Sequence, residues 1–484
     1  MRAAGVVPER ASRSCGLHLH VIGSVAPLVG DADLEQLRAE LEGDLVAPGD
    51  AGWDAARQAW NLAVDQHPAA VVRVSGPDDV RAVVAFAGGH DLGVATQGTG
   101  HAAGTLGPLD DVMLVKTERL VGVHVDREDR RARVGAGVVM RDLVDAAQAE
   151  DLSGLPGSSV DVGVVGYTLG GGMSWLGRRF GLACNHVHAI ELVTADGELR
   201  RIDADTEPEL FWALRGGGGN FGVVTAIELR LLPIAEVYGG SLILPAEDGR
   251  EILRRYREWT RTVPDEVTSI ARLLRLPPLD EIPAPLRDRP LVTLGACYAG
   301  GESEGAELIG PLRELGEPIM DTFATIPASQ LVTIHMDPEE PVPGVGNHAL
   351  IGELTEDAVD AFFDAAGPES GSPLTVAELR HAGGALSTVP ADGGALPRLD
   401  AAFVLFAVGS LMDPSRAEQI SRHLHLVADA VSPWATGGAF LNFVEGRADA
   451  ETLFPADTRR RLAAVKERWD PEGLFRAGYT LPVA

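Results

Sequence analysis

The N-terminal part of the chain alternates between helical and strand-like hydrophobic patterns. Residues 32–44 and 53–62 carry apolar side chains at helical spacing. The apolar run AVVRVSG at 70–76 predicts a strand, and a helix over 77–88 follows, beginning with the capping sequence Pro-Asp-Asp. A second strand is expected over 92–96. This order predicts a small β-α-β unit.

From Val112 the pattern becomes rich in strands. MLVKT, GVHVD, RARVGAG, AIELVTADGELRRID and FGVVTAIELRLLP are β-type runs, and several of them alternate apolar and polar residues. Helices are expected only over 140–149 and 208–214. We therefore predict an α+β subdomain with a mainly antiparallel sheet, to which MLVKT is assigned.

Glycines mark two stretches of this region. The run 157–185 is dense in glycine but also contains Val, Leu, Trp and Phe, a composition that suits backbone lying close against a flat ligand. The second stretch is 94–107, VATQGTGHAAGTLG, where glycines let backbone amides cradle a phosphate beside His101. Taken alone, the second stretch would be a surface turn with a stray histidine.

Residues 217–222, GGGNFG, formally match the dinucleotide fingerprint G-x-G-x-x-G. That fingerprint must follow a strand and open a helix. Here a helical segment precedes it and the β-run VVTAIEL follows, so a Rossmann site is not expected.

Beyond Pro233 the chain forms a second module. Strands are expected at GGSLIL, LVTLGACYAG, TVAELRHAGGAL and AAFVLFAVGSL, and the helices that alternate with them cover 246–263, 304–315, 355–366 and 414–430. This alternation predicts a sheet with helices on one face. The last helix is expected over 457–469.

Composition narrows the functional classes. The 484 residues carry a net charge of −29, which disfavours nucleic acid and anionic membranes as partners. No apolar run reaches the about 18 residues of a transmembrane span. Three cysteines (Cys15, Cys184 and Cys297) imply neither a disulfide framework nor a zinc site, and no metal is expected. These features favour a cytoplasmic protein. Residues 1–30 lack the order of a signal peptide and predict a disordered or mis-started leader.

Seven sequence markers together resemble one enzyme family. They are GDLVAPGD…WDAARQAWN, PAAVVRVSGPDDV, QGTGH, the glycine run, ELVTADGEL, ELFWALRGGGGNFGVVT, and FLNF with LAAVKERWDPEGLFR. In this order they resemble FAD-linked oxidases of the vanillyl-alcohol oxidase/p-cresol methylhydroxylase superfamily, on the berberine bridge enzyme-like branch. The resemblance covers the chain from about residue 44 to its end.

The resemblance implies an α+β fold with four parts. After the leader at 1–30 comes a two-subdomain FAD-binding domain of p-cresol methylhydroxylase type at 31–237. An α/β substrate domain at 238–430 has a mainly antiparallel sheet covered by helices on one face. The C-terminal segment 431–484 returns to the FAD domain.

The resemblance also implies how FAD is bound. Amides around Gly98, Thr99 and Gly100 would bind the pyrophosphate, and His101 would be joined covalently to the 8α-methyl carbon of the isoalloxazine, which raises the flavin's reduction potential. The family position of a second, cysteinyl tether holds Ser159, and Cys184 belongs to another segment. A single histidyl link is therefore expected, as in 6-hydroxy-D-nicotine oxidase-like members. The remaining FAD contacts implied are Gln97, Gly104, Ser158, Ser159, Gly163, Gly166, Gly170, Gly171, Gly172, Gly222, Val223, Val224 and Asn442.

The catalytic base is left open by the sequence. The family's Tyr-x-Asn is here Phe440-Leu441-Asn442, so Asn442 can still bond flavin or substrate but the tyrosine is absent. Tyr167 and Glu378 are equal candidates for the missing base. Glu378 shares a strand face with Arg380, whereas His381 points to the opposite face. For a further set of polar residues structural roles are favoured: His186, His188, His335 and Asp337.

The expected activity is that of an oxidase. It would remove hydride from a C–H bond next to an alcohol or amine of a small organic substrate and reduce O₂ to hydrogen peroxide. A dehydrogenase with another acceptor and a flavin-binding protein without turnover are the alternatives. The substrate and the oligomeric state stay open.

Overall fold

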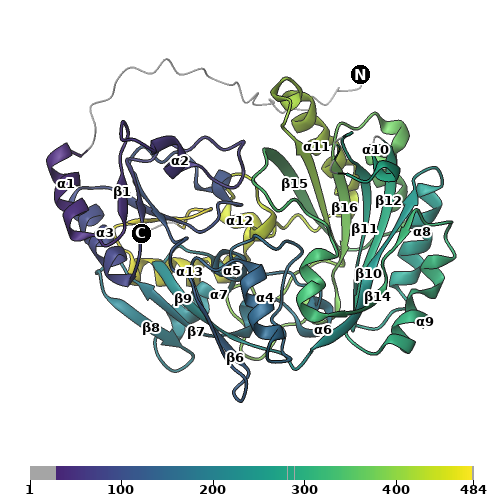
Figure 1. Ribbon diagram of the computed structural model, residues 1–484, viewed down its shortest axis with the longest axis horizontal. Coiled ribbons are helices and arrows are strands. Elements are labelled where there is room, and N and C mark those ends of the chain that lie inside the picture. The colour runs from purple at the N-terminus through teal and green to yellow at the C-terminus, as the bar shows by residue number, and fades with distance from the viewer. Residues whose placement is uncertain (1–28, 279, 281, 288, 482–484) are drawn as a thin grey trace, which may run out of the picture.

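The computed structural model describes residues 29–278, 280, 282–287 and 289–481. Residues 1–28 of the predicted leader, with Cys15, lie outside the described residues. Within the described ranges the strands form three sheets, one mainly parallel and two antiparallel (Figure 1). The α+β fold class predicted from the sequence is confirmed.

The first sheet contains the strand that leads into the QGTGH loop. Its order in the described chain is β1-β2-β4-β3-β18, and all neighbours except β1 and β2 run parallel. The strands are β1 (Asp44–Val46), β2 (Ala70–Arg73), β3 (Gly93–Gln97), β4 (Val112–Lys116) and β18 (Phe475–Arg476). The assignment of MLVKT to the antiparallel sheet was wrong, because β4 lies between β2 and β3. Through β18 the C-terminal segment pairs with β3.

The second sheet is antiparallel and has the order β5-β6-β9-β7-β8 among the described residues. Its strands are β5 (Val123–Asp126), β6 (Arg131–Gly135), β7 (Val187–Val193), β8 (Leu199–Asp203) and β9 (Val223–Arg230). One hydrophobic core joins this sheet to the first.

Helices pack around these two sheets. α3 begins with Pro77 at its first position, as predicted, and the buried Asp79 carboxylate accepts hydrogen bonds from the backbone amides of Glu42, Gly43 and Ser75. The helices of this region are α1 (Asp31–Glu40), α2 (Trp53–Arg57), α3 (Pro77–Gly89), α4 (Met140–Gln148), α5 (Val164–Leu169), α6 (Gly177–Phe180), α7 (Pro208–Gly217), α12 (Ala450–Leu453) and α13 (Ala456–Trp469).

Two predictions about helices were wrong. The helix expected over 53–62 ends at Arg57, because the chain leaves α2 to approach the QGTGH loop, where the Trp60 amide donates to the Thr99 carbonyl at 3.1 Å. The glycine run, treated as non-helical, contains α5 and α6. α5 starts at Val164, directly after Gly163, and buries Val164, Val165 and Leu169.

The third sheet forms the wall opposite the first two. Its main path is β13-β10-β12-β11-β16-β17-β15, with β14 added on β10, and all pairs are antiparallel. The strands are β10 (Glu236–Pro245), β11 (Val267–Arg275), β12 (Pro290–Tyr298), β13 (Met320–Asp321), β14 (Ala324–Pro327), β15 (Gly344–Ile351), β16 (Val376–His381) and β17 (Phe403–Ser410). β11, β13, β14 and β15 were not predicted.

Four helices cover the outer face of this sheet: α8 (Gly249–Thr260), α9 (Glu302–Arg313), α10 (Glu356–Ala366) and α11 (Ala417–Val431). Tyr256, Phe362 and Leu424 fill the core between these helices and the strands. The predicted antiparallel sheet with helices on one face is confirmed, and its other face looks toward the first two sheets (Figure 1). Within the described ranges, no helix is long and apolar enough to cross a bilayer.

Candidate functional site

The loop after β3 is shaped by glycines. Gly100 has a φ of +97°, and a Cβ added there would lie 2.7 Å from Gln97 Nε2 and 2.9 Å from the Trp60 nitrogen. A side chain at Gly104 would collide with the carbonyl oxygen of Glu445. Among the described residues, the amides of 98–102 donate no hydrogen bond to a backbone carbonyl. These amides are therefore available to an anion such as a phosphate.

We expect Gly100→Ala to distort the conformation of this loop. The Cβ contacts and the left-handed φ should destabilise the fold by roughly 1–3 kcal/mol and weaken cofactor binding. Gly88→Ala on α3 is the matched control, because nothing lies within 4 Å of its Cβ position. Urea unfolding together with the absorbance of retained cofactor measures both effects, and equal behaviour of the two variants would contradict this role for Gly100.

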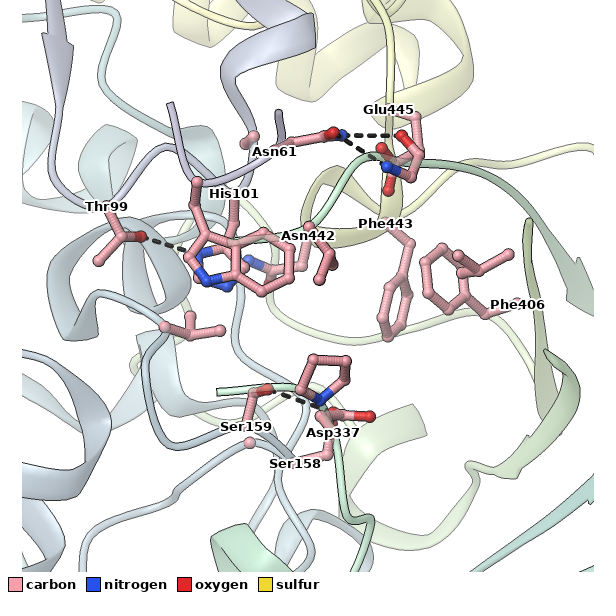
Figure 2. Close-up of a pocket in the computed structure, with 18 of the residues that line it drawn as sticks. Asn61, Thr99, His101, Ser158, Ser159, Asp337, Phe406, Asn442, Phe443 and Glu445 are labelled. Atoms are coloured by element: carbon pink, nitrogen blue, oxygen red, sulfur yellow. Dashed lines mark hydrogen bonds between the residues drawn. The ribbon is translucent and has the colours of Figure 1, made fainter. Parts of the chain in front are cut away.

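His101 is held at the end of this loop by three neighbours. Its ring stacks on Trp60, with 4.1 Å between centroids and an interplanar angle of 18°. Nδ1 lies 2.8 Å from the Thr99 hydroxyl (Figure 2), and Nε2 lies 3.6 Å from Asp161 Oδ1. Nε2 and both Asp161 oxygens are buried with no hydrogen-bond partner among the described residues. The imidazole is thus fixed in orientation, with one nitrogen left unbonded.

The end of the glycine run packs against the C-terminal segment. The Asn442 side chain accepts from the Gly172 amide at 2.8 Å and donates to the Tyr167 carbonyl at 3.1 Å. A Cβ at Gly171, which has a φ of +122°, would lie 2.7 Å from the Phe440 ring. Some of these glycines therefore serve packing between segments as well as a ligand. Asn442 holds the backbone of the glycine run in place.

A cavity of about 1400 Å³ brings most of the predicted residues together. Of those predicted from sequence, the cavity wall includes Gln97, Gly98, Thr99, Gly100, His101, Ser158, Ser159, Gly163, Gly166, Tyr167, Gly170, Gly222, Val224, Glu378 and Asn442. Gly104, Gly171, Gly172 and Val223 are not part of the wall; the first three pack against neighbouring segments, and Val223 is fully buried in β9. Gly218 and Gly219, from the rejected fingerprint, do line it. As expected, that fingerprint follows α7 and precedes β9.

The opposite wall is the inner face of the third sheet. Arg272 on β11 pairs with Glu378 on β16, Glu378 with Phe406 on β17, and Phe406 with His348 on β15. Since paired residues share a face, these side chains form one row across four strands. Glu378 and Arg380 share a strand face, as predicted, and both line the cavity, whereas the His381 ring bonds Arg178 away from it at 2.9 Å.

Glu378 is the centre of a buried charge network. Its carboxylate accepts from Arg380 Nε at 2.6 Å and lies 2.8 Å from His335 Nε2, while the His335 Nδ1 bonds Asp337. Asp337 also accepts from Ser158 and Ser159, each at 3.3 Å. Burial acts to raise the pKa of Glu378, but the charges of Arg380 and His335 outweigh it and lower that pKa to about 2. The carboxylate is ionised at neutral pH.

His335 and Asp337 therefore belong to the site, although the sequence favoured structural roles for them. Each ring nitrogen of His335 lies within hydrogen-bond distance of a carboxylate, so the ring links Asp337 to Glu378. Burial acts to raise the pKa of Asp337, but the charges of His335 and Arg380 hold it well below its usual range. Among the described residues no set of His, Cys, Asp and Glu side chains has the geometry of a metal site.

Tyr167 is poorly placed to accept a proton. Its hydroxyl donates to the Leu155 carbonyl at 3.0 Å, and burial raises the pKa of the phenol far above its usual range. Phe440 is fully buried, and its amide donates to His348 Nε2 at 3.0 Å. Burial lowers the pKa of His348 to about 4, so its ring is a neutral acceptor. Of the two candidate bases, the geometry favours Glu378.

The sequence missed Arg272 and Glu445. Arg272 is 4% exposed in the middle of an apolar strand, and an arginine inside such a run was the available signal. Glu445 lines the cavity (Figure 2), and burial raises its pKa to about 7. Nothing local in the sequence marks Glu445, because its burial depends on the contact of its segment with the QGTGH loop.

The raised pKa of Glu445 predicts a pH-dependent stability. Since the unfolded carboxyl titrates near 4.5, the folded state binds the extra proton between about pH 4.5 and 7. This contribution is complete below pH 4.5 and is lost as the pH rises through about 7. We expect Glu445→Gln to be more stable than wild type above pH 7, by up to about 3 kcal/mol. Urea unfolding across this range tests it, with the exposed Glu451→Gln as control; parallel profiles would contradict it.

The other polar residues singled out lie outside the cavity wall. His186 Nε2 bonds the Phe180 carbonyl at 2.9 Å, and neither His186 nor His188 lines the cavity. The Cys184 thiol donates to the Leu396 carbonyl at 3.4 Å, and burial raises its pKa to about 12. Cys184 does not face the cavity with His101.

Comparisons with known proteins agree with this geometry. A family model described as an FAD binding domain matches residues 68–203. The chain is also similar to (R)-6-hydroxynicotine oxidase of Paenarthrobacter nicotinovorans, with 26% identity over 472 residues that cover 91% of this chain and 97% of that protein.

Solved structures share the fold. Wild-type BBE-like 1 of Physcomitrella patens superposes with a TM-score of 0.80 at 21% identity, covering 93% of this chain and 99% of that one. Wild-type Phl p 4.0202, a glucose dehydrogenase, superposes with a TM-score of 0.79 at 19% identity, covering 94% and 100%. At these identities the likeness is one of fold.

Proposed function

We propose that this chain, an FAD-linked oxidoreductase, is a berberine bridge enzyme-like oxidase acting on a small organic substrate. The reaction removes a hydride from a C–H bond next to an alcohol or an amine. The observation that carries the proposal is that the His101 loop and the Glu378 network line the same cavity. A dehydrogenase is the second candidate, since a relative of the same fold is named a glucose dehydrogenase.

The residues around the cavity fit FAD. Its volume accommodates both a dinucleotide and a substrate, and the amides of 98–102 are free to meet phosphate oxygens. The Gln97 amide is buried with neither its nitrogen nor its oxygen bonded within the described chain, which suits a polar ligand. Gly163, Gly166 and Gly170 form a wall without side chains.

His101 is the residue we propose to be joined to the cofactor. Thr99 and Trp60 fix its ring, and Nε2 makes no hydrogen bond in the described structure. The burial of Cys184 away from the cavity and the presence of Ser159 in the cavity wall support a single link. When bound, FAD supplies the two-electron acceptor and passes its electrons to O₂, which yields hydrogen peroxide.

Glu378 is the proposed proton acceptor. An alcohol becomes more acidic as its hydride leaves, and Glu378 offers an ionised carboxylate in the cavity wall as the acceptor of that proton. Arg380 and His335 keep the Glu378 carboxylate ionised and fixed in the cavity wall. Asp337 in turn fixes His335 and joins the network to Ser158 and Ser159 of the glycine run.

Product analysis separates the two candidate functions. With a substrate that reduces the flavin, an oxidase in air forms one hydrogen peroxide for each substrate oxidised. A dehydrogenase forms almost none and turns over only after an artificial acceptor such as dichlorophenolindophenol is added. Turnover that depends on that dye, with no peroxide, would overturn the oxidase assignment.

A further inference from the structure

The charged end of the cavity contains a buried hydrogen-bond donor that has no acceptor among the described residues. Both Glu378 oxygens already accept, one from Arg380 and one facing His335, and both Asp337 oxygens are bonded as well. Arg272 is buried, and its Nη1 donates to the His335 carbonyl at 2.8 Å. Its Nε has no partner among the described residues. A buried donor without an acceptor is costly, so this wall favours a ligand that brings an acceptor.

The formal charges lead to the same preference. Arg380 forms an ion pair with Glu378, whereas no carboxylate of the described residues lies within ion-pairing distance of Arg272. Arg272 therefore brings a buried positive charge that has no ion-pair partner among the described residues. An oxyanion placed there gains a charge-assisted hydrogen bond, whereas an ammonium group meets repulsion.

Beside this charged row the floor of the cavity becomes apolar. Two residues further along the strands, Leu274 pairs with Val376, and Val376 with Val408. A step of two residues along a strand is about 7 Å. All three side chains line the cavity, and Ile243, Leu276, Leu286 and Leu291 continue the same surface.

We propose that the substrate is an amphiphilic oxyanion, which binds Arg272 and Arg380 through a carboxylate or phenolate and lays an apolar body over Leu274, Val376 and Val408. The claim that this ligand is a substrate rests on the proposed function. The claim that it binds rests on the cavity wall alone. The proposal narrows the substrate class from alcohols and amines to hydroxyl compounds that carry an anionic group.

The test compares matched ligands on the FAD-loaded protein by calorimetry, without turnover. The probes are 4-hexylbenzoate, the neutral 4-hexylbenzamide, the cationic 4-hexylbenzylamine, and benzoate without the tail. We expect 4-hexylbenzoate to bind at least about tenfold more tightly than the amide and than benzoate, and the amine to bind most weakly. Equal affinity of acid and amide, or tightest binding of the amine, would overturn the proposal. Addition of 4-nitrophenol, ionised at about pH 8, shows whether a phenolate is accepted like a carboxylate.

Variants assign the effect to the residues named. Arg272→Gln should reduce the preference for the acid over the amide to below about twofold. Arg272→Lys keeps the positive charge and should retain most of this preference, and it is the variant to use if Arg272→Gln unfolds. Arg254→Gln on the outer helix α8, where Arg254 pairs with Asp360, is the control and should keep the full preference. If Arg272→Gln and Arg254→Gln behave alike, Arg272 does not bind the anion.

A second variant and its control test the apolar part of the cavity. Val408→Thr should weaken 4-hexylbenzoate by about threefold or more and leave benzoate unchanged. Val404→Thr, on the same strand but outside the cavity wall, should change neither ligand. Loss of turnover with every compound, together with selective anion binding, would refute the oxidase while leaving this proposal in place. Turnover without anion selectivity would refute this proposal and leave the oxidase in place.

Discussion

Glu378→Gln is expected to slow anaerobic flavin reduction by roughly 10²–10³-fold, because a proton acceptor in the transition state contributes on this scale. The amide keeps the size of the side chain and still accepts from Arg380 Nε, the bond that the carboxylate makes at 2.6 Å. Its oxygen, however, cannot take up the substrate proton at ordinary pH. The rate constant of flavin bleaching in stopped flow measures the effect.

Tyr167→Phe is the matched control, since Tyr167 was the equal candidate from sequence. Its hydroxyl serves the Leu155 carbonyl, so its loss should change the rate by less than about threefold. Breaking a buried ion pair also destabilises the fold, by about 3–5 kcal/mol when one partner is removed. The melting temperature and the FAD content of Glu378→Gln therefore accompany the kinetics. A fully loaded Glu378→Gln protein that reduces at the wild-type rate would exclude Glu378 as the acceptor.

His101→Ala is expected to convert a retained cofactor into a released one. After acid precipitation, yellow flavin should stay with the wild-type pellet and pass into the supernatant of the variant. Loss of the covalent bond should also lower the flavin's reduction potential and slow hydride removal, by about tenfold for each 1.4 kcal/mol.

His67→Ala is the control for the covalent link, because His67 is exposed and outside the cavity wall. Its flavin should remain in the pellet. Flavin in the supernatant of the wild-type protein would show that His101 forms no covalent bond. Mass spectrometry of the peptide that contains His101 then reports whether one linkage is present.

Where the local sequence pattern was strong, it predicted the helices and strands well. It did not predict features that depend on the pairing of distant strands. The helix at α3 and the strand β3 follow from capping residues and apolar runs, and both lie within a residue or two of the prediction. The position of β4 between β2 and β3 is a property of long-range pairing, which the run MLVKT does not encode. α5 was missed because glycine disfavours helices intrinsically, and tertiary packing of Val164 and Val165 overrides that preference.

The two parts of the candidate site, the loop around His101 and the network around Glu378, were not predicted equally well. The QGTGH loop and the glycine run carry their chemistry within short segments, and so the residues around His101 and Ser158 could be named. The network around Glu378 joins His335, which precedes β15, to strands β11 and β16, and only the folded sheet brings them together. His335 and Asp337 were recognised as polar, but their role became visible only through these contacts.

The most direct measurement is an anaerobic titration of the purified, FAD-loaded protein with hydroxyl compounds, followed by admission of air. An active oxidase loses its yellow colour with at least one of them, and air restores the colour with one hydrogen peroxide formed for each flavin. Colour that persists with every alcohol, sugar, amine and phenolic compound would contradict catalysis and favour a flavin-binding protein without turnover.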